Sequence, residues 1–243
     1  MDSEITGNKL TSPKIVGIIQ ARMGSSRLPG KMMMDLCGFP LIQWVIERCK
    51  RSTLLDEIVV ATTKNAEDDA LIETAYNLGV KTYRGSESDV LGRFVEAAKL
   101  YDAEVIVRVC ADNPLVAPEE IDRLIDFFLK GRPDYAFNHI PKMGNNYPDG
   151  LGAEIFSYKL LKRISNVTHL IRHREHVTQY IADNIEAFDV RTFPCMSPYN
   201  EPSMKLDIDV MVDFKQMQKI CEGLNFASTP IDILRQWSSI RGL

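Results

Sequence analysis

The sequence predicts an α/β fold in which helices cover both faces of a doubly wound, mostly parallel sheet. Between residues 14 and 131, apolar strand-like segments alternate four times with amphipathic helical segments. Such alternation is typical of parallel sheets with crossover helices. The strand-like segments are nearly all apolar and rich in β-branched residues, as strands buried on both faces require. A chain of 243 residues suits a single domain of this class with an insertion.

Each element of the first half has its own local signal. The strand-like segments lie at 14–20, 56–62, 80–85 and 103–112, and the helical segments at 41–52, 66–79, 89–101 and 118–131. Gly79 suits a helix end, since glycine readily adopts the left-handed conformation of a C-cap. Asp89 or Ser88 is suited to cap the third helix, and Pro118 to begin the fourth. The strands would present their carboxyl ends at one edge, where ligands bind in such sheets.

Beyond residue 134 the alternation breaks down into turn residues and short strand-like runs. We expect residues 140–200 to form an insertion that covers the active-site edge and contains one helical stretch at 168–184. Residues 204–225 are expected to rejoin the sheet and to end in a helix. A terminal helix is predicted to begin at Pro230.

The composition narrows the class of protein. The net charge of −4 argues against broad binding to nucleic acid. No apolar run approaches the roughly 18 residues of a membrane span. Residues 1–13 are polar and are expected to be a disordered tail rather than a signal peptide, so that one domain spans 14–243. Five scattered cysteines predict reduced, buried thiols in a cytoplasmic protein.

A glycine-rich, basic segment follows the first strand. Residues 20–31 read QARMGSSRLPGK and contain two glycines, two serines and three cations. Backbone N–H groups in a tight glycine turn bind phosphate oxygens, and Arg22, Arg27 and Lys31 can neutralise their charge. The glycine spacing is that of neither a Walker A loop nor a GxGxxG loop. The segment therefore predicts a phosphate-binding loop of another class.

Polar residues also end two other strands. Asp112 precedes an Asn-Pro turn, so its carboxylate is expected to point into the crevice above the sheet. Thr62 and Thr63 end the second strand, where threonines suit the cap of a following helix.

The basic loop resembles the ARxGSxRxPGK signature of the cytidylyltransferases that make CMP-activated sugar acids. Within that superfamily, the chain from about residue 14 to residue 223 is most similar to the group of spore coat polysaccharide biosynthesis protein F. The similar segments are VVATT, RGSESDVLGRF, VRVCADNPL, PDGLGAEIF, REHVTQYI and LDIDVMVDF. The resemblance implies a glycosyltransferase-A-like nucleotidyltransferase fold with an inserted subdomain for dimerisation and substrate binding.

The same resemblance implies a reaction. CMP would be transferred from CTP to an acidic sugar or related anionic acceptor, and pyrophosphate would be released, for surface polysaccharide or glycoconjugate biosynthesis. The implied catalytic residues are Arg22, Lys31, Asp112 and Asp209. The two aspartates would hold the cofactor Mg²⁺, which rarely takes an all-protein cage. Val210 and Met211 replace the family's Thr-Pro, so Asp207, which shares a predicted strand face with Asp209, is a reserve ligand.

The remaining implied contacts fall into two sets. The nucleotide-binding set is Gln20, Ala21, Arg22, Gly24, Ser25, Arg27, Lys31, Thr62, Thr63, Arg84, Gly85 and Ser86. The acceptor-binding set is Asp149, Gly150, Glu154, Arg174 and His176. The implied partners are CTP, a small anionic acceptor and a second copy of the chain, without nucleic acid or membrane.

Some patterns leave alternatives open. Asp89 and Arg93 could form an ion pair across one helical turn. His169, His173 and His176 fall on one predicted helix face, but a metal site there is less favoured than a substrate or dimer contact. The acceptor could also be a phosphate or phosphonate. Two other functions remain: a nucleotidyltransferase that uses UTP or GTP with a sugar phosphate, and a nucleotide-binding scaffold without turnover.

Overall fold

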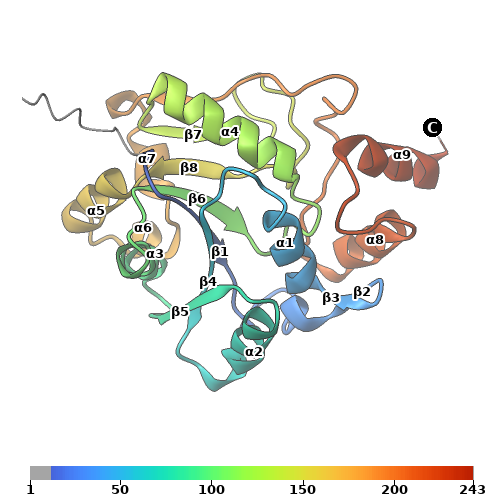
Figure 1. Cartoon of the computed structure of the whole chain (residues 1–243), viewed down its shortest axis with the longest axis horizontal. Coiled ribbons are helices and arrows are strands. Elements are labelled where there is room, and N and C mark those ends of the chain that lie inside the picture. Colours follow the sequence, from blue (N-terminus) through green and yellow to red (C-terminus); the bar gives the residue numbers. More distant parts are fainter. Residues whose placement is uncertain (1–11, 243) are drawn as a thin grey trace, which may run out of the picture.

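Residues 12–242 of the chain are described by the computed structural model shown in Figure 1. The tail predicted at 1–13 lies, up to residue 11, outside the described residues. The seven strands of the central sheet are β1 (Ile15–Gln20), β4 (Glu57–Thr63), β5 (Lys81–Gly85), β6 (Val105–Cys110), β7 (Tyr135–Phe137), β8 (Glu154–Ser157) and β9 (Val190–Arg191). Their order across the sheet is β5-β4-β1-β6-β8-β7-β9. Only β8 runs against its neighbours, so the mostly parallel sheet predicted from the sequence is confirmed.

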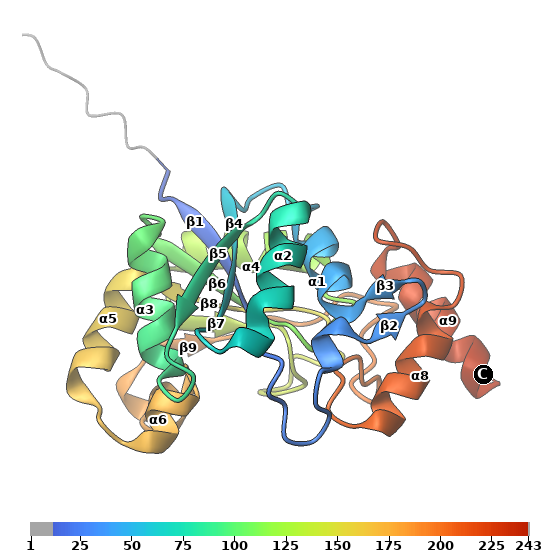
Figure 2. The ribbon, with the colours of Figure 1, turned by 90° about the horizontal axis from the view of Figure 1, so that it is seen from below.

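Helices cover both faces of this sheet (Figures 1 and 2). The helices are α1 (Leu41–Cys49), α2 (Asp69–Asn77), α3 (Val90–Leu100), α4 (Pro118–Gly131), α5 (Tyr158–Val167), α6 (Ile171–Glu175), α7 (Gln179–Asp183), α8 (Met211–Cys221) and α9 (Pro230–Arg241). The core on one face includes Trp44 of α1 and Ile121 of α4, and the core on the other includes Phe94 of α3 and Leu161 of α5. Two buried layers on one sheet give the doubly wound architecture.

Local signals place several elements where the sequence predicts them. The Asp89 carboxylate accepts a hydrogen bond from the Gly92 backbone N–H at 2.8 Å and so caps α3. Gly79 follows α2 with a φ of 70°, a left-handed conformation that glycine adopts without strain. Thr229 and Asp232 form a capping box at the start of α9.

Two expectations for the second half are wrong. The helical stretch at 168–184 is split into α6 and α7, and between them His176 has an extended backbone with a φ of −120° and a ψ of 105°. The buried His173 ring is hydrogen-bonded to Thr168 and Asp183, each at 2.6 Å. Residues 204–210 do not rejoin the sheet. Their backbone bonds instead with loops at the strand ends: the Leu206 N–H donates to the Asp149 carbonyl oxygen at 2.8 Å, and the Ile208 N–H donates to the Asp112 carbonyl oxygen at 2.9 Å.

The segment 140–200, predicted to be an insertion, is partly inside the sheet, since β8 lies between β6 and β7. A small ribbon of β2 (Asp35–Leu36) and β3 (Phe39–Pro40) lies beside α8, and three 3-10 turns span Lys31–Met33, Ala66–Asp68 and Ile185–Ala187. All five cysteines are free thiols; Cys37 is exposed, contrary to the expectation that all are buried. Within residues 12–242, no helix combines the length and apolarity that crossing a membrane would require.

Candidate active site

The loop after β1 is folded tightly around its own backbone at the carboxyl edge of the sheet. The Met23 carbonyl oxygen accepts hydrogen bonds from the N–H groups of Ser25 at 2.8 Å and Gly30 at 3.0 Å. Gly30 has a φ of 72°, which favours glycine at this turn. Ala21 is buried at the base of the loop and donates its N–H to Ala61 of β4. The structure thus holds the predicted phosphate-binding loop in a compact shape beside two strand ends.

Two cations of the loop meet the two aspartates predicted to bind metal. The buried Lys31 ammonium donates to Asp112 at 3.0 Å and to the carbonyl oxygen of Ile208 at 2.6 Å. Arg27, which is largely exposed, donates to Asp209 at 2.6 Å. Residues separated by more than eighty positions in the sequence are therefore brought together at one edge of the sheet.

The third cation also faces acidic groups. Arg22 lies 3.6 Å from Glu87 in an exposed ion pair. A Cβ atom at Gly24 would come within 2.9 Å of the Glu67 carboxylate and 3.6 Å of the Glu87 carboxylate, so the loop backbone lies against these acidic side chains. Each loop cation is therefore paired with a carboxylate, and an incoming triphosphate would have to replace those pairs.

The carboxylates at the edge fit a hard divalent cation. Asp112 and Asp209 offer oxygen ligands of the kind that Mg²⁺ prefers. Asp207 lies nearby with a buried Oδ1 atom that has no hydrogen-bond partner within the described chain. No three His, Cys, Asp or Glu side chains among residues 12–242 gather into a complete ligand set. Mg²⁺ shared with phosphate oxygens and water would suit such an incomplete set.

The threonines predicted to bind nucleotide are engaged with an aspartate that sequence reasoning did not identify. The hydroxyls of Thr62 and Thr63 donate to Asp68 at 2.8 and 2.5 Å, and the Met23 N–H donates to the same carboxylate at 2.7 Å. These hydrogen bonds hold the pKa of Asp68 below its ordinary value although burial opposes them. Asp68 thus ties the loop to the end of β4, and a nucleotide contact of the threonines stays a prediction.

The end of β5 is also held by side-chain hydrogen bonds. Arg84 donates to the Thr63 carbonyl oxygen at 2.9 Å, to Asp69 at 2.5 Å and to the Asn65 carbonyl oxygen at 2.7 Å. A side chain at Gly85 would meet the Arg93 stem at 2.8 Å, which explains the glycine. The exposed Ser86 hydroxyl accepts from the Asp89 N–H at 3.0 Å.

A row of polar side chains crosses one face of the sheet from the loop toward β7. Arg108 on β6 donates to the Gln20 side chain at 3.1 and 3.3 Å and forms a buried ion pair with Glu154 on β8. Glu154 also accepts from Tyr135 at 2.7 Å and from Thr178 at 2.9 Å. Gln20 and Glu154, predicted for nucleotide and acceptor, are thus joined through Arg108.

Asp149 and Gly150 lie where the 204–210 segment crosses the edge. Burial, with repulsion by the Asp207 carboxylate, raises the pKa of Asp149 to about 6. Gly150 has a φ of 88°, and a Cβ atom there would come within 2.8 Å of the Leu206 backbone. Its N–H donates to the His139 carbonyl oxygen at 2.8 Å.

The other two predicted acceptor residues, Arg174 and His176, lie in and just after α6. Arg174 pairs with Asp89 at 2.5 Å and donates to the Ser165 carbonyl oxygen at 3.0 Å. The predicted Asp89–Arg93 ion pair is therefore wrong, and Arg93 donates to a backbone carbonyl oxygen instead. His176 is exposed just after α6, so the three histidines do not share one helix face.

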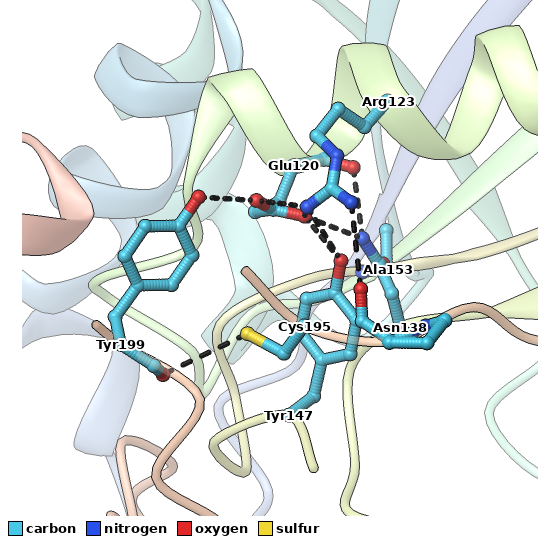
Figure 3. Close-up of polar contacts among 8 residues, drawn as sticks. Glu120, Arg123, Asn138, Tyr147, Ala153, Cys195 and Tyr199 are labelled. Atoms are coloured by element: carbon cyan, nitrogen blue, oxygen red, sulfur yellow. Dashed lines mark hydrogen bonds and ion pairs between the residues drawn. The ribbon is translucent and has the colours of Figure 1, made fainter. Parts of the chain in front are cut away.

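A cluster of hydrogen bonds surrounds the buried carboxylate of Glu120 in the first turn of α4 (Figure 3). The Glu120 carboxylate is fully buried and accepts from Arg123 at 2.8 Å, from Tyr199 at 2.9 Å and from the Tyr147 hydroxyl. Asn138, which follows β7, donates to the Glu120 carbonyl oxygen at 2.9 Å. The cluster joins α4, the end of β7 and two distant loops.

Three residues important to this edge were missed by sequence reasoning. In the sequence, Asp68 and Glu120 resemble the acidic residues that commonly occur at the start of helices. Arg108 gave a usable signal, because a charge inside the apolar run VIVRVC must find a buried partner.

Comparison with known proteins gives consistent matches. The family model described as "Cytidylyltransferase" matches residues 16–231. Spore coat polysaccharide biosynthesis protein SpsF of Bacillus subtilis is 33% identical over 211 residues, which cover 85% of each chain. A 3-deoxy-manno-octulosonate cytidylyltransferase of Bdellovibrio bacteriovorus is 42% identical over 119 residues, about half of either chain. The solved structure of a cytidylyltransferase from Leptospira borgpetersenii has a TM-score of 0.88 and 30% identity, covering 95% of this chain and 96% of that one.

Proposed function

Because the chain belongs to the cytidylyltransferase family, we propose that it transfers CMP from CTP to a sugar-like, anionic acceptor and releases pyrophosphate. The observation that carries the proposal is the pairing of loop cations with edge carboxylates. Lys31 with Asp112 and Arg27 with Asp209 bring a phosphate-binding loop against two metal-binding candidates. Those are the two kinds of group that nucleotidyl transfer needs.

In this proposal the loop holds the triphosphate of CTP. Arg22, Arg27 and Lys31 leave their carboxylate partners and neutralise the phosphates, while the loop N–H groups orient them. An acceptor hydroxyl oxygen then forms a bond to the α-phosphorus and releases its proton to solvent. The bond from the α-phosphorus to the oxygen of the β-phosphate breaks, and pyrophosphate leaves with the electron pair. Positioning and charge neutralisation supply most of the acceleration.

We propose Mg²⁺ as the cofactor, with Asp112 and Asp209 as its ligands. When bound, it would withdraw charge from the phosphate oxygens and from the leaving pyrophosphate. The same two carboxylates form ion pairs with Lys31 and Arg27. Asp112 and Asp209 would exchange these cations for Mg²⁺ while Lys31 and Arg27 pair with the phosphates, so that the buried Lys31 ammonium keeps an anionic partner.

The acceptor is proposed from the relatives. One relative's name refers to spore coat polysaccharide biosynthesis and another's to 3-deoxy-manno-octulosonate, which is an acidic sugar. We propose a related acidic sugar here, serving the synthesis of surface polysaccharide in the cytoplasm. A homodimer is also proposed, supported by the exposed apolar side chains of Val167, Leu170 and Ile171 around the start of α6. Sedimentation analysis would test it.

The proposed function is tested by pyrophosphate release from CTP, with sugar acids supplied as acceptors. We expect release that depends on CTP, acceptor and Mg²⁺, and a loss of at least a hundredfold in kcat for Asp112→Asn and Asp209→Asn. Asp126→Asn, which alters an exposed pair on α4, is the control and should keep the wild-type rate. Release with UTP or GTP but not with CTP would reject the proposal.

A further inference from the structure

The side chains that the sequence predicts to bind the nucleotide base are engaged with the protein itself. The hydroxyls of Thr62 and Thr63 donate to Asp68. Arg84 donates to two carbonyl oxygens and to Asp69. A base bound at this edge of the sheet would therefore have to find other hydrogen-bond partners.

Two exposed glutamates lie beside the phosphate-binding loop at the same edge. Glu67 belongs to the turn that follows β4, and Glu87 lies between β5 and α3. Their carboxylates approach one position beside Gly24, where a Cβ atom would lie 2.9 Å from a Glu67 oxygen and 3.6 Å from a Glu87 oxygen. Two hydrogen-bond acceptors thus face one small volume next to the loop backbone.

The lack of a side chain at Gly24 keeps this volume open. The φ of Gly24 lies outside the left-handed range that favours glycine, in contrast to that of Gly30 in the same loop. The backbone conformation therefore does not call for glycine at position 24. Any side chain there would instead enter the space between the loop and the two carboxylates. Glycine at such a position suits the close approach of a ligand to the backbone.

The present partners of Glu87 would change when a nucleotide binds. Its carboxylate accepts from the Asn65 amide at 2.9 Å and lies 3.6 Å from Arg22 in an exposed ion pair. When Arg22 turns to the triphosphate, as the proposed function requires, Glu87 loses its cation. A hydrogen-bond donor on the nucleotide would then give the carboxylate a new partner.

Cytosine carries such a donor. Its exocyclic amino group has two N–H bonds, and glutamate and aspartate accept from this group in protein–nucleic acid complexes. Uracil has a carbonyl oxygen at the same ring position, which a carboxylate would repel. A pair of carboxylates at this position would therefore separate CTP from UTP.

We propose that Glu67 and Glu87 accept hydrogen bonds from the amino group of cytosine and so make the site specific for CTP over UTP. The inference rests on the proposed transfer reaction and adds the residues that select its nucleotide. Gly24 leaves the space for the amino group, and the Asn65 amide keeps the Glu87 carboxylate in place.

The test measures Kd by calorimetry in the presence of Mg²⁺ for three nucleotides. These are CTP, UTP and the triphosphate of pyrimidin-2-one riboside, which lacks the amino group but keeps the ring nitrogen and the carbonyl oxygen of cytosine. The wild-type chain should bind CTP at least tenfold more tightly than either of the others. In Glu67→Gln and in Glu87→Gln, the ratio of the Kd for UTP to the Kd for CTP should fall at least fivefold, because a glutamine amide offers both a C=O and an N–H group.

A matched control and a structural alternative complete the design. Glu73→Gln, at an exposed glutamate of α2, should leave all three Kd values unchanged. If Glu87 served only to hold Arg22 away from the phosphates, Glu87→Gln would lower the Kd for CTP and for UTP by the same factor. An unchanged ratio in both Glu67→Gln and Glu87→Gln would overturn the inference.

The failure of the inference is distinguishable from the failure of the proposed function. If the chain binds none of the three nucleotides, the proposed function is wrong and the inference falls with it. If the wild-type chain binds CTP and the pyrimidin-2-one nucleotide equally well, the amino group is not recognised and only the inference is overturned.

Discussion

At the scale of single residues, Lys31 connects the phosphate-binding loop to both aspartate segments. Its buried ammonium binds Asp112 and the carbonyl oxygen that precedes Asp209. A lysine ammonium is a compact charge with three donors, which suits it to exchange one oxygen partner for another. In the proposed reaction this exchange transfers the charge from Asp112 to a phosphate.

The change Lys31→Met tests this role. It keeps the length of the side chain and removes the charge, so the Kd for CTP measured by calorimetry should rise at least tenfold. Lys50→Met, at an exposed lysine that directly follows α1, is the control and should leave the affinity unchanged. Equal CTP affinity in wild type and Lys31→Met would contradict the assignment of the loop.

The lowered pKa of His139 predicts that part of the free energy of unfolding is lost in acid. Its pKa is about 3 in the folded protein against an ordinary value of 6.5, so the unfolded chain binds more protons between these values. Stability therefore rises with pH in this window and is lost as pH falls through it. Between pH 6.5 and 4.5 this loss should be about 2–3 kcal/mol.

His139→Asn should remove this part of the acid sensitivity. Urea unfolding at several pH values would measure it as a shallower fall in the free energy of unfolding of the variant below pH 6.5. Parallel curves for wild type and variant would show that the imidazole is not held neutral by burial.

Residue-level prediction from sequence succeeded where a motif was continuous and failed where partners are distant. Residues 20–31 were identified as a loop because their spacing alone is informative. Arg108 gained its role from the strand register, since it lies opposite Glu154 only in the antiparallel pairing of β6 with β8. No local pattern in the sequence reveals that pairing.

At the scale of elements, α4 fixes the loops that border the active edge. The buried carboxylate of Glu120, in the first turn of α4, accepts hydrogen bonds from Arg123, Tyr147 and Tyr199 (Figure 3). Burial, with the charge of the Glu120 carboxylate, raises the pKa of both tyrosines, which therefore stay protonated and donate. The cluster is satisfied only when all four segments are in place.

Glu120→Ala should therefore lower the free energy of unfolding by about 3–5 kcal/mol, because it leaves Arg123 and two buried hydroxyls without an acceptor. Glu119→Ala, at the exposed neighbour in the same turn, should change it by less than about 0.5 kcal/mol. Urea unfolding measures both. A loss in Glu120→Ala as small as in Glu119→Ala would contradict a stabilising role of the cluster.

The elements of the first half were predictable because each carries its own apolar period and cap. The region from 134 to 213 was not, because its strands have two to four residues and depend on long-range contacts. Asn145, for example, donates to Thr192 at 2.9 Å and accepts through its carbonyl oxygen from the Cys195 N–H at 2.7 Å. Such contacts between distant loops replace the periodic patterns that sequence reasoning uses.

At the scale of the whole molecule, the sheet brings the phosphate-binding loop and the candidate metal ligands to one edge. The carboxyl ends of β1, β4, β5 and β6 carry the loop, Asp68, Arg84 and Asp112, and the crossing segment adds Asp207 and Asp209. The fold class and the location of the site at this edge follow from strand–helix alternation and from the general rule for parallel sheets. The path of residues 204–210 across this edge could not be predicted from the sequence, because their alternating apolar residues also suit a strand within the sheet.

The central claim, that this edge binds CTP with Mg²⁺, is tested most directly by thermal unfolding with CTP, UTP, GTP and ATP, each with and without Mg²⁺. A ligand at a hundredfold excess over its Kd stabilises the native state by about 2.7 kcal/mol, which corresponds to a rise in Tm of about 5–10 °C for a chain of this size. We predict such a rise for CTP with Mg²⁺, a much smaller one for the other nucleotides, and loss of the Mg²⁺-dependent part in Asp209→Asn. Equal shifts with all four nucleotides, or none with CTP, would contradict the account.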